Sequence, residues 1–192
     1  MSDRRPTPRI RTPHLVRDLA TLDQALYEAV TVTRTPTLDT ALRRLSAAAD
    51  HSKLSFAVAG LLAVRGGRSR RAAALGVAAI GVASATANLL GKQLVRRPRP
   101  HRSADSPFPG RHVPMPDSAS FPSGHTASAV AFAAAVGPAL PAAAVPLGLL
   151  ACAVGYSRVH TGVHYPGDVV AGALLGTGSA ALVMAVASRR DR

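Results

Sequence analysis

With 192 residues, the chain is long enough for one domain and short for two. Apolar residues make up 47% of it, yet only 4% is aromatic and Trp is absent, which favours closely packed membrane helices over a large soluble core. The net charge of +13 suits nucleic acid, anionic lipid or a phosphorylated substrate. Because the cations stand at the ends of apolar runs, without interleaved aromatic residues, nucleic-acid binding is disfavoured. A single cysteine, Cys152, excludes an intrachain disulfide and a thiolate metal cage.

The first 50 residues are polar. Residues 1–18 are rich in Arg and Pro and predict a tail that is either irregular or bound to the membrane surface. Two amphipathic stretches follow, separated by a break at residues 33–37, and each gathers its apolar residues on one helical face. These residues are Leu22, Leu26, Ala29 and Val30 in the first stretch and Leu38, Leu42 and Leu45 in the second. Both stretches fit helices in the membrane interface, and they fit equally well a helical hairpin that caps a bundle.

The apolar part of the chain is divided into five segments. They are residues 54–64, 72–91, 124–139, 142–156 and 166–187. Residues 72–91 carry no charge and make a helix of about 30 Å, which is enough to cross a bilayer. The first segment is short and spans only if residues 46–53 extend it. We therefore expect an all-α, integral-membrane bundle of about five membrane helices, with residues 1–50 as an amphipathic N-terminal segment, 51–188 as the membrane domain and 189–192 as a basic tail.

Three polar clusters stand at the ends of these apolar segments. They comprise Lys92 to Pro100, Pro122 to His125, and Ser157 and Arg158 followed by His164 and Asp168. The chain reverses near Pro138 and Pro141, so the direction of travel brings all three clusters to the same membrane face. The topology alone therefore predicts that these residues form one site.

The residue types in the three clusters suit phosphoryl transfer. Lys92, Arg99 and Arg158 are cations, and the N-terminus of a helix presents free N–H groups to an anion. His164 and Asp168 are four residues apart and share a helical face, so Asp168 can accept the Nδ1 hydrogen and leave Nε2 free to attack. His125 then remains to protonate the departing oxygen.

Each cluster also has an ordinary structural interpretation. The group from Lys92 to Arg99 fits cations that flank a membrane helix, and Ser123 with Gly124 fits a plain capped helix start. His164 and Asp168 fit a structural pair. A metal site would have to use His101, His112, His125, His160 and His164, but no HExxH motif or set of carboxylates accompanies them, so we expect no metal. His160 and Tyr165 are expected to line the wall of the site.

The three clusters together resemble the type 2 phosphatidic acid phosphatase superfamily. That family carries the patterns KxxxxxxRP, PSGH and SRxxxxxHxxxD, and every specified position is matched here in order. The matching residues are Lys92, Arg99, Pro100, Pro122, Ser123, Gly124, His125, Ser157, Arg158, His164 and Asp168. The resemblance covers roughly residues 50–188 and departs from six-helix members in residues 21–48, which carry too much charge for a span.

This resemblance implies a metal-independent lipid phosphate phosphatase with a phosphohistidine intermediate and no cofactor. By analogy His164 is the nucleophile, Asp168 its partner and His125 the general acid. Lys92, Arg99, Ser123, Gly124 and Arg158 would hold the phosphoryl oxygens. The implied substrate is phosphatidic acid, phosphatidylglycerol phosphate, or a polyprenyl phosphate or diphosphate.

Two alternatives remain open at the level of sequence. One is a vanadate-dependent haloperoxidase, which shares the motifs but resembles soluble helical proteins. The other is a membrane protein that binds anionic lipids without catalysis. As partners we expect the membrane and a lipid phosphate, with no nucleic acid. Residues 65–71 predict a basic turn, and this turn and the basic residues at 189–192 favour cytoplasm at the end away from the site. The site is therefore expected on the extracytoplasmic face of the cell membrane.

Overall fold

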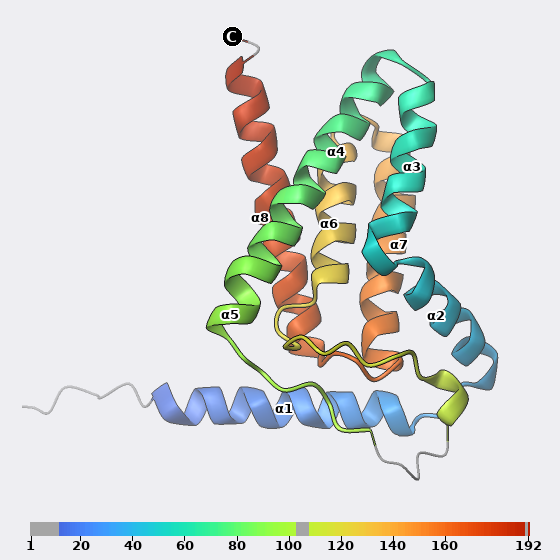
Figure 1. Ribbon diagram of the computed structural model, residues 1–192, viewed down its shortest axis with the longest axis vertical. Coiled ribbons are helices and arrows are strands. Elements are labelled where there is room, and N and C mark those ends of the chain that lie inside the picture. Colours follow the sequence, from blue (N-terminus) through green and yellow to red (C-terminus); the bar gives the residue numbers. More distant parts are fainter. Residues whose placement is uncertain (1–11, 103–107, 191) are drawn as a thin grey trace, which may run out of the picture.

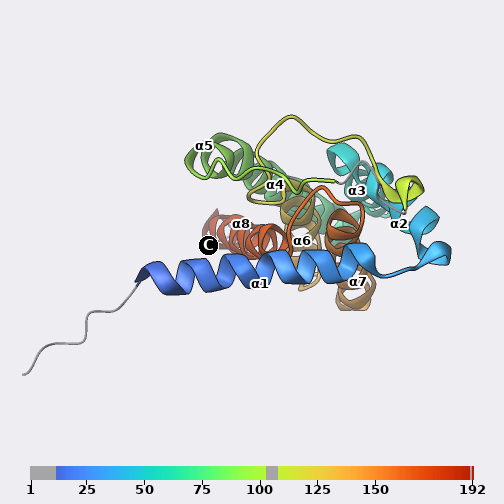
Figure 2. The ribbon, with the colours of Figure 1, turned by 90° about the horizontal axis from the view of Figure 1, so that it is seen from below.

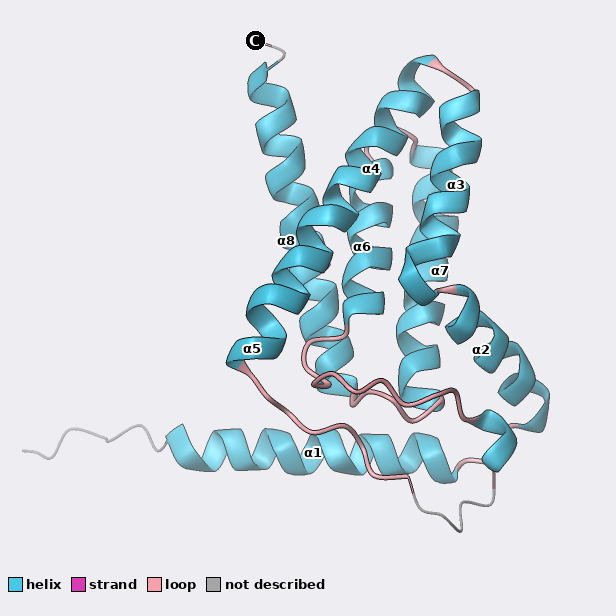
Figure 3. Cartoon of the chain, in the orientation of Figure 1, coloured by secondary structure: helices cyan, strands magenta, loops and turns pink. Residues whose placement is uncertain are grey.

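A computed structural model describes residues 12–102, 108–190 and 192, and in these residues the chain is helical without any strand (Figures 1 and 3). The part of the N-terminal tail before Thr12 lies outside the described residues. The elements are α1 (Thr12–Val32), α2 (Pro36–Ala48), η1 (Asp50–Ser52), α3 (Lys53–Val64), α4 (Gly67–Ala85), η2 (Thr86–Gly91), α5 (Lys92–Leu94), η3 (Pro109–Arg111), α6 (Gly124–Val136), α7 (Pro141–His160) and α8 (Pro166–Arg190).

Three helices are long and apolar enough to cross a membrane, by length and composition. They are the continuous helix Gly67–Leu94, which joins α4, η2 and α5, then α7 and α8. The other two predicted segments, α3 and α6, have 12 and 13 residues. Each is therefore only about 18–20 Å long. The predicted all-α membrane fold is confirmed, and three of its five apolar segments have spanning length.

Small side chains allow the central helix α6 to pack closely against α4, α7 and α8. Ala79 and Ala83 of α4 and Ala127 and Ala131 of α6 are fully buried in one cluster. On α8, a Cβ added to Gly172 would lie 2.5 Å from the carbonyl oxygen of Ser123. The low aromatic content of the sequence thus serves helix contacts that are close enough for backbones to touch.

Several helices begin or end away from the predicted positions. α1 begins at Thr12, so the irregular alternative for the tail up to residue 18 is wrong for its last seven residues. α4 begins at Gly67, which places most of the predicted basic turn inside the helix, because Arg is a good helix former. α2 and α3 do not join into one long helix. His51 and Ser52 between them have positive φ angles of 55° and 59°, and the chain bends there.

The predicted topology brings the polar helix ends together at one end of the bundle. α5 ends there, α6 begins there, α7 ends there and α8 begins there (Figure 1). α1 lies across this same end, roughly perpendicular to the bundle helices (Figure 2). Tyr27 of α1 packs against Tyr165 in the loop before α8, with ring centroids 5.3 Å apart. The N-terminal helices therefore sit beside the predicted site.

Candidate active site

Six of the eight predicted site residues line one cavity of about 470 Å³ that is open to solvent. These residues are Lys92, Arg99, Gly124, His125, Arg158 and His164. The other two, Ser123 and Asp168, are fully buried just behind its wall. Three cations and two histidines, which come from three helices and two loops, therefore surround a single space.

The imidazole ring of His164 points its Nε2 atom towards Arg99. Arg99 Nη1 lies 3.3 Å from His164 Nε2, and since Arg only donates, Nε2 carries the lone pair. Nδ1 lies 3.5 Å from Asp168 Oδ2, at the outer limit of hydrogen bonding. Burial first, and then the charges of Arg99 and Arg158, lower the pKa of His164 to about 4 against the opposing effect of Asp168. His164 is therefore neutral at physiological pH, as a nucleophile must be.

Asp168 is fixed by contacts that the sequence patterns did not predict. Its Oδ2 accepts a hydrogen bond from the backbone N–H of Tyr165 at 2.9 Å, and its Oδ1 accepts one from Arg97 Nη1 at 3.0 Å. Arg97 in turn lies over the Tyr165 ring and pairs with Asp23 of α1 at 2.7 Å. The carboxylate that faces His164 is thus held from both sides.

The start of α6 has the geometry of an anion site. Ser123 is its N-cap, and its Oγ accepts from the backbone N–H of Thr126 at 3.5 Å and from the hydroxyl of Thr126 at 2.9 Å. The backbone N–H of Ser123 donates to the carbonyl of Asp168 at 2.9 Å, so the starts of α6 and α8 are joined. A Cβ on Gly124 would meet no atom within 4 Å, which leaves open space for an anion above the first turn.

Lys92 and Arg99 reach the cavity from the same side and share a partner. Lys92 Nζ donates to Ser118 Oγ at 3.1 Å, and Arg99 donates to the Ser118 carbonyl at 2.8 Å. Arg99 also donates to the Val163 carbonyl at 2.7 Å, one residue before His164. The loop that contains Ser118 therefore sets the positions of both cations.

On the opposite side of the cavity, His125 and Arg158 contact the segment that follows α2. His125 Nε2 lies 2.8 Å from Asp50 Oδ1, and Arg158 Nη1 lies 3.7 Å from the same oxygen. Arg158 Nη1 donates to Ser46 Oγ at 2.6 Å. Its Nε is buried and has no hydrogen-bond partner among the described residues. Neither Ser46 nor Asp50 belongs to a recognisable motif, so neither could be predicted from the sequence.

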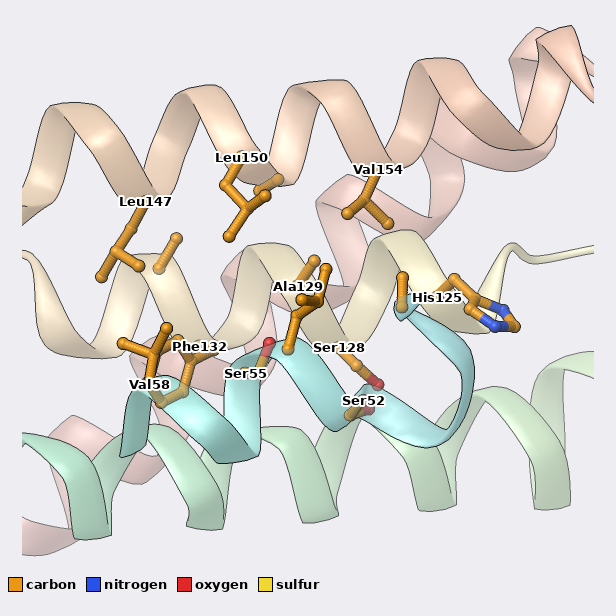
Figure 4. Close-up of a pocket in the computed structure, with 14 residues that line it drawn as sticks. Ser52, Ser55, Val58, His125, Ser128, Ala129, Phe132, Leu147, Leu150 and Val154 are labelled. Atoms are coloured by element: carbon orange, nitrogen blue, oxygen red, sulfur yellow. The ribbon is translucent and has the colours of Figure 1, made fainter. Parts of the chain in front are cut away.

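A second, narrower crevice begins beside His125 and runs between α3, α6 and α7 (Figure 4). Its free volume is only about 20 Å³, room for about one water molecule, and ten of its 14 lining residues are apolar. Val58, Phe132 and Leu147 lie at the end away from His125. Ser52 and Ser128 are its polar residues nearest to the histidine. The crevice is thus a narrow, mainly apolar seam that leads from His125 into the membrane region of the bundle.

The remaining histidines do not assemble into a metal site in the described part of the chain, where no group of three or more His, Cys, Asp or Glu is placed to hold an ion. His160 lies 2.9 Å from Asp39 of α2, and Asp39 also accepts from Arg111 at 3.0 Å. Neither His160 nor Tyr165 lines the cavity that holds the predicted site residues, so their expected place in its wall is not seen. The expected independence of metal stays a prediction.

Known proteins resemble this chain in sequence. The family model of the PAP2 superfamily matches residues 71–192. The decaprenylphosphoryl-5-phosphoribose phosphatase of Mycobacterium tuberculosis is 40% identical over 129 residues, which cover 65% of this chain and 67% of that protein. The lipid A 1-phosphatase of Rhizobium johnstonii is 38% identical over 111 residues, 54% of this chain and 43% of that protein.

Solved structures give the same result. Aquifex aeolicus LpxE superposes with a TM-score of 0.72 at 26% identity, over 85% of this chain and 94% of that one. A transmembrane PAP2-type phosphatidylglycerolphosphate phosphatase from Bacillus subtilis has a TM-score of 0.70 at 24% identity and supports the fold, over 90% and 87% of the two chains. The chain belongs to the PAP2 superfamily. The predicted family, the membrane fold and the phosphatase class are confirmed.

Proposed function

We propose that the protein hydrolyses a phosphomonoester or diphosphate of a membrane lipid, without metal, through a phosphohistidine on His164. The observation that carries the proposal is the single cavity in which three cations and two histidines surround the start of α6, with an apolar crevice at its side. The cavity suits a phosphoryl group, and the crevice suits the chain attached to it.

In the first step, the phosphoryl oxygens bind to Lys92, Arg99 and Arg158 and to the N–H groups at the start of α6. Arg158 Nε is a buried donor with no partner among the described residues, so it is available to a phosphate oxygen. Arg99 exchanges its contact with His164 Nε2 for one with the phosphate, which frees the lone pair. The nitrogen–phosphorus bond forms, the bond from phosphorus to the leaving oxygen breaks, and His125 supplies the proton to that oxygen.

In the second step, water attacks the phosphohistidine. His125, now neutral, takes a proton from the water, and the nitrogen–phosphorus bond breaks to return a neutral His164. Asp168 stabilises the charge on the His164 ring while phosphorus is attached. Arg97 and Asp23 keep the carboxylate in place during both steps.

The substrate class follows from the two neighbouring spaces. The relatives are named for decaprenylphosphoryl-5-phosphoribose and lipid A, which both carry phosphate on a long apolar body. The polar cavity suits the phosphoryl group that these lipids share, and the crevice beside His125 is lined mainly by aliphatic side chains, which do not distinguish one apolar chain from another. We therefore propose broad acceptance of polyprenyl phosphates or diphosphates, phosphatidic acid and phosphatidylglycerol phosphate.

The decisive assay measures phosphate release by the purified protein in detergent. Long-chain lipid phosphates should be hydrolysed, and a soluble sugar phosphate should be a poor substrate. EDTA should leave the rate unchanged, and vanadate should inhibit. A loss of activity on chelation that Mg²⁺ restores would overturn the mechanism. Comparable catalytic efficiency on the sugar phosphate would overturn the substrate class. Halide oxidation without phosphate release would indicate a haloperoxidase.

We further propose that the site faces the extracytoplasmic side of the cell membrane. The far end of the bundle carries Arg65, Arg68 and Arg70 at the turn between α3 and α4, and Arg189 and Arg190 at the end of α8. Such clusters favour the cytoplasm. The cations at the site end have a chemical role that explains their presence there.

This orientation is tested with single cysteines on a Cys152→Ser background. Asp117→Cys lies in the exposed loop at the site end and should react with an impermeant thiol reagent on intact cells. Arg65→Cys at the opposite end is the matched control and should react only after lysis. The reverse pattern would place the site in the cytoplasm.

A further inference from the structure

Beyond the family motifs, the end of α2 supplies two side chains to the site. Ser46 and Asp50 are four residues apart, and both reach across to motif residues on other elements. Ser46 is fully buried and accepts a hydrogen bond from Arg158 at 2.6 Å, which fixes the end of α2 against α7. The family model begins at residue 71, so both residues lie outside the part of the chain that it describes.

Asp50 lies where a carboxylate is unfavourable unless it has a function in the site. It lines the cavity that is proposed to bind phosphate, and its side chain is 43% exposed there. A negative charge at this point repels an anionic substrate. The backbone that carries it is also unusual, because the next two residues, His51 and Ser52, both have left-handed φ angles although neither is glycine. Such conformations cluster at functional sites.

The geometry points to Asp50 as the positioning residue of the general acid His125. Asp50 Oδ1 lies 2.8 Å from His125 Nε2, so it accepts that N–H and favours the protonated ring. This contact opposes burial and the charge of Arg158, which lower the pKa of His125 to about 4. Nδ1 makes no hydrogen bond within the described residues and is left for the leaving oxygen. The inference rests on the proposed function and adds a second histidine–carboxylate pair to it, with Asp50 serving His125 as Asp168 serves His164.

The proton balance follows from this arrangement. His125 enters the first step as an imidazolium with Nε2–H on Asp50 and gives its Nδ1 proton to the leaving oxygen as the bond to phosphorus breaks. It becomes neutral with Nε2–H still on Asp50, and water restores the Nδ1 proton in the second step. Asp50 stays ionised throughout and touches neither substrate nor phosphorus.

The test is Asp50→Asn, with Asp18→Asn, an exposed carboxylate of α1, as the matched control. We expect kcat on a lipid phosphate, whose alkoxide leaving group needs a proton, to fall about tenfold to hundredfold, less than when the acid itself is lost. On an aryl phosphate, whose leaving group needs no proton, kcat should fall less than threefold, roughly. KM should stay the same or improve, because a repulsive charge is removed. Asp50→Glu should recover part of kcat.

The double variant Asp50→Asn with His125→Ala separates this role from a structural one. If Asp50 acts through His125, the double variant should be no slower than His125→Ala alone. Equal losses on both substrates, or losses that multiply in the double variant, would overturn the inference. An improved KM with unchanged kcat would also overturn it and make Asp50 a competitor of the substrate. A wild-type protein that releases no phosphate from any lipid would refute the proposed function itself, which is a different outcome.

Discussion

The two histidines of the site differ in their surroundings, and this difference predicts different roles. His164 is almost fully buried between Arg99 and Asp168, with its Nε2 lone pair facing a cation. His125 is about one quarter exposed and faces a carboxylate. A neutral ring next to cations suits attack on phosphorus, whereas a ring next to a carboxylate suits proton donation.

Substitution of each histidine should therefore give a different pattern. His164→Ala removes the nucleophile and should abolish activity on every substrate. His125→Ala should lose about 10²–10⁴-fold on lipid phosphates and least on an aryl phosphate, because only the proton donor is gone. Asp168→Asn should fall between the two, since the attacking ring remains. Rapid quenching with labelled substrate and peptide mapping should find acid-labile phosphate on His164, and label on Ser123 or His125 would contradict the assignment.

The low pKa of His164, about 4, also predicts a pH dependence. The nucleophile loses its lone pair only when protonated, so its contribution to kcat/KM is complete above the usual histidine value of about 6.5 and falls as the pH drops through about 4. The free energy of unfolding changes in the same direction. Burial of the neutral ring costs nothing by this effect above about pH 6.5, and the free energy of unfolding falls as the pH drops from about 6.5 to about 4, because only the unfolded chain binds the proton there. After correction for the substrate's own ionisation near pH 6, the acid limb of kcat/KM should lie near 4. An acid limb of kcat/KM near pH 6.5 would show that burial does not lower the pKa of His164.

At the scale of residues, the sequence predicted the side chains with characteristic spacing and missed those with contacts only in space. Lys92, Arg99 and Arg158 were predictable because each stands at a helix end beside a motif. Ser46 and Asp50 were not, because their partners lie 112 and 75 residues away and no local pattern marks them. A lone carboxylate in an amphipathic segment has the same local signature whether it faces solvent or a histidine.

At the scale of elements, the arrangement of the site depends on how closely α8 approaches α6. An added Cβ would collide with the Ser123 carbonyl at Gly172 and with the Ala127 carbonyl one turn later at Gly176. The same contact carries the hydrogen bond from Ser123 to Asp168. The start of α6 and the start of α8 thus keep their relative position because two glycines permit it.

Gly172→Ala is therefore expected to separate the two helices. Overpacking of a tight interface costs about 1–3 kcal/mol, so thermal unfolding in detergent should begin at a lower temperature. Phosphatase activity should also fall at temperatures where the variant is still folded, because the phosphate-binding turn of α6 moves relative to Asp168. Gly178→Ala, where an added Cβ meets nothing within 4 Å, is the control and should be neutral or slightly stabilising. Equal behaviour of the two variants would show that the contact does not position the site.

The sequence predicted which segments are helices better than where they end. Uncharged runs such as residues 72–91 are unambiguous, because little else accommodates 20 apolar residues in order. Arg68, Arg70 and Arg71 were assigned to a turn, yet they form the first turns of α4. Charged residues mark where the membrane ends. The backbone hydrogen bonds of the helix do not stop there, so the helix continues past the charged residues. The kink after α2 depends on two left-handed residues that no propensity predicts.

At the scale of the whole molecule, α1 connects the bundle to its surroundings. Its long axis crosses the site end of the bundle, and its N-terminal half extends beyond the bundle helices (Figures 1 and 2). Leu15, Leu19, Leu22 and Leu26 share one stripe and are 62%, 56%, 55% and 47% exposed. Gln24 and Glu28 lie on the opposite face and bond to each other. Tyr27 and Asp23, between these faces, hold α1 to the loop before α8.

The capping interpretation made from the sequence describes one face of α1, and the interfacial interpretation stays a prediction for its leucine stripe. One face caps the bundle, and the leucine stripe has no protein partner among the described residues, so we expect it to lie in the lipid interface with the polar face towards water. The chain contains no Trp, which allows a direct measurement. In Leu19→Trp, lipids brominated on their acyl chains should quench the fluorescence, and in the control Gln24→Trp they should not. Equal quenching at both positions, or none at position 19, would show that α1 lies in water and that the site opens directly to solvent and not at the membrane surface.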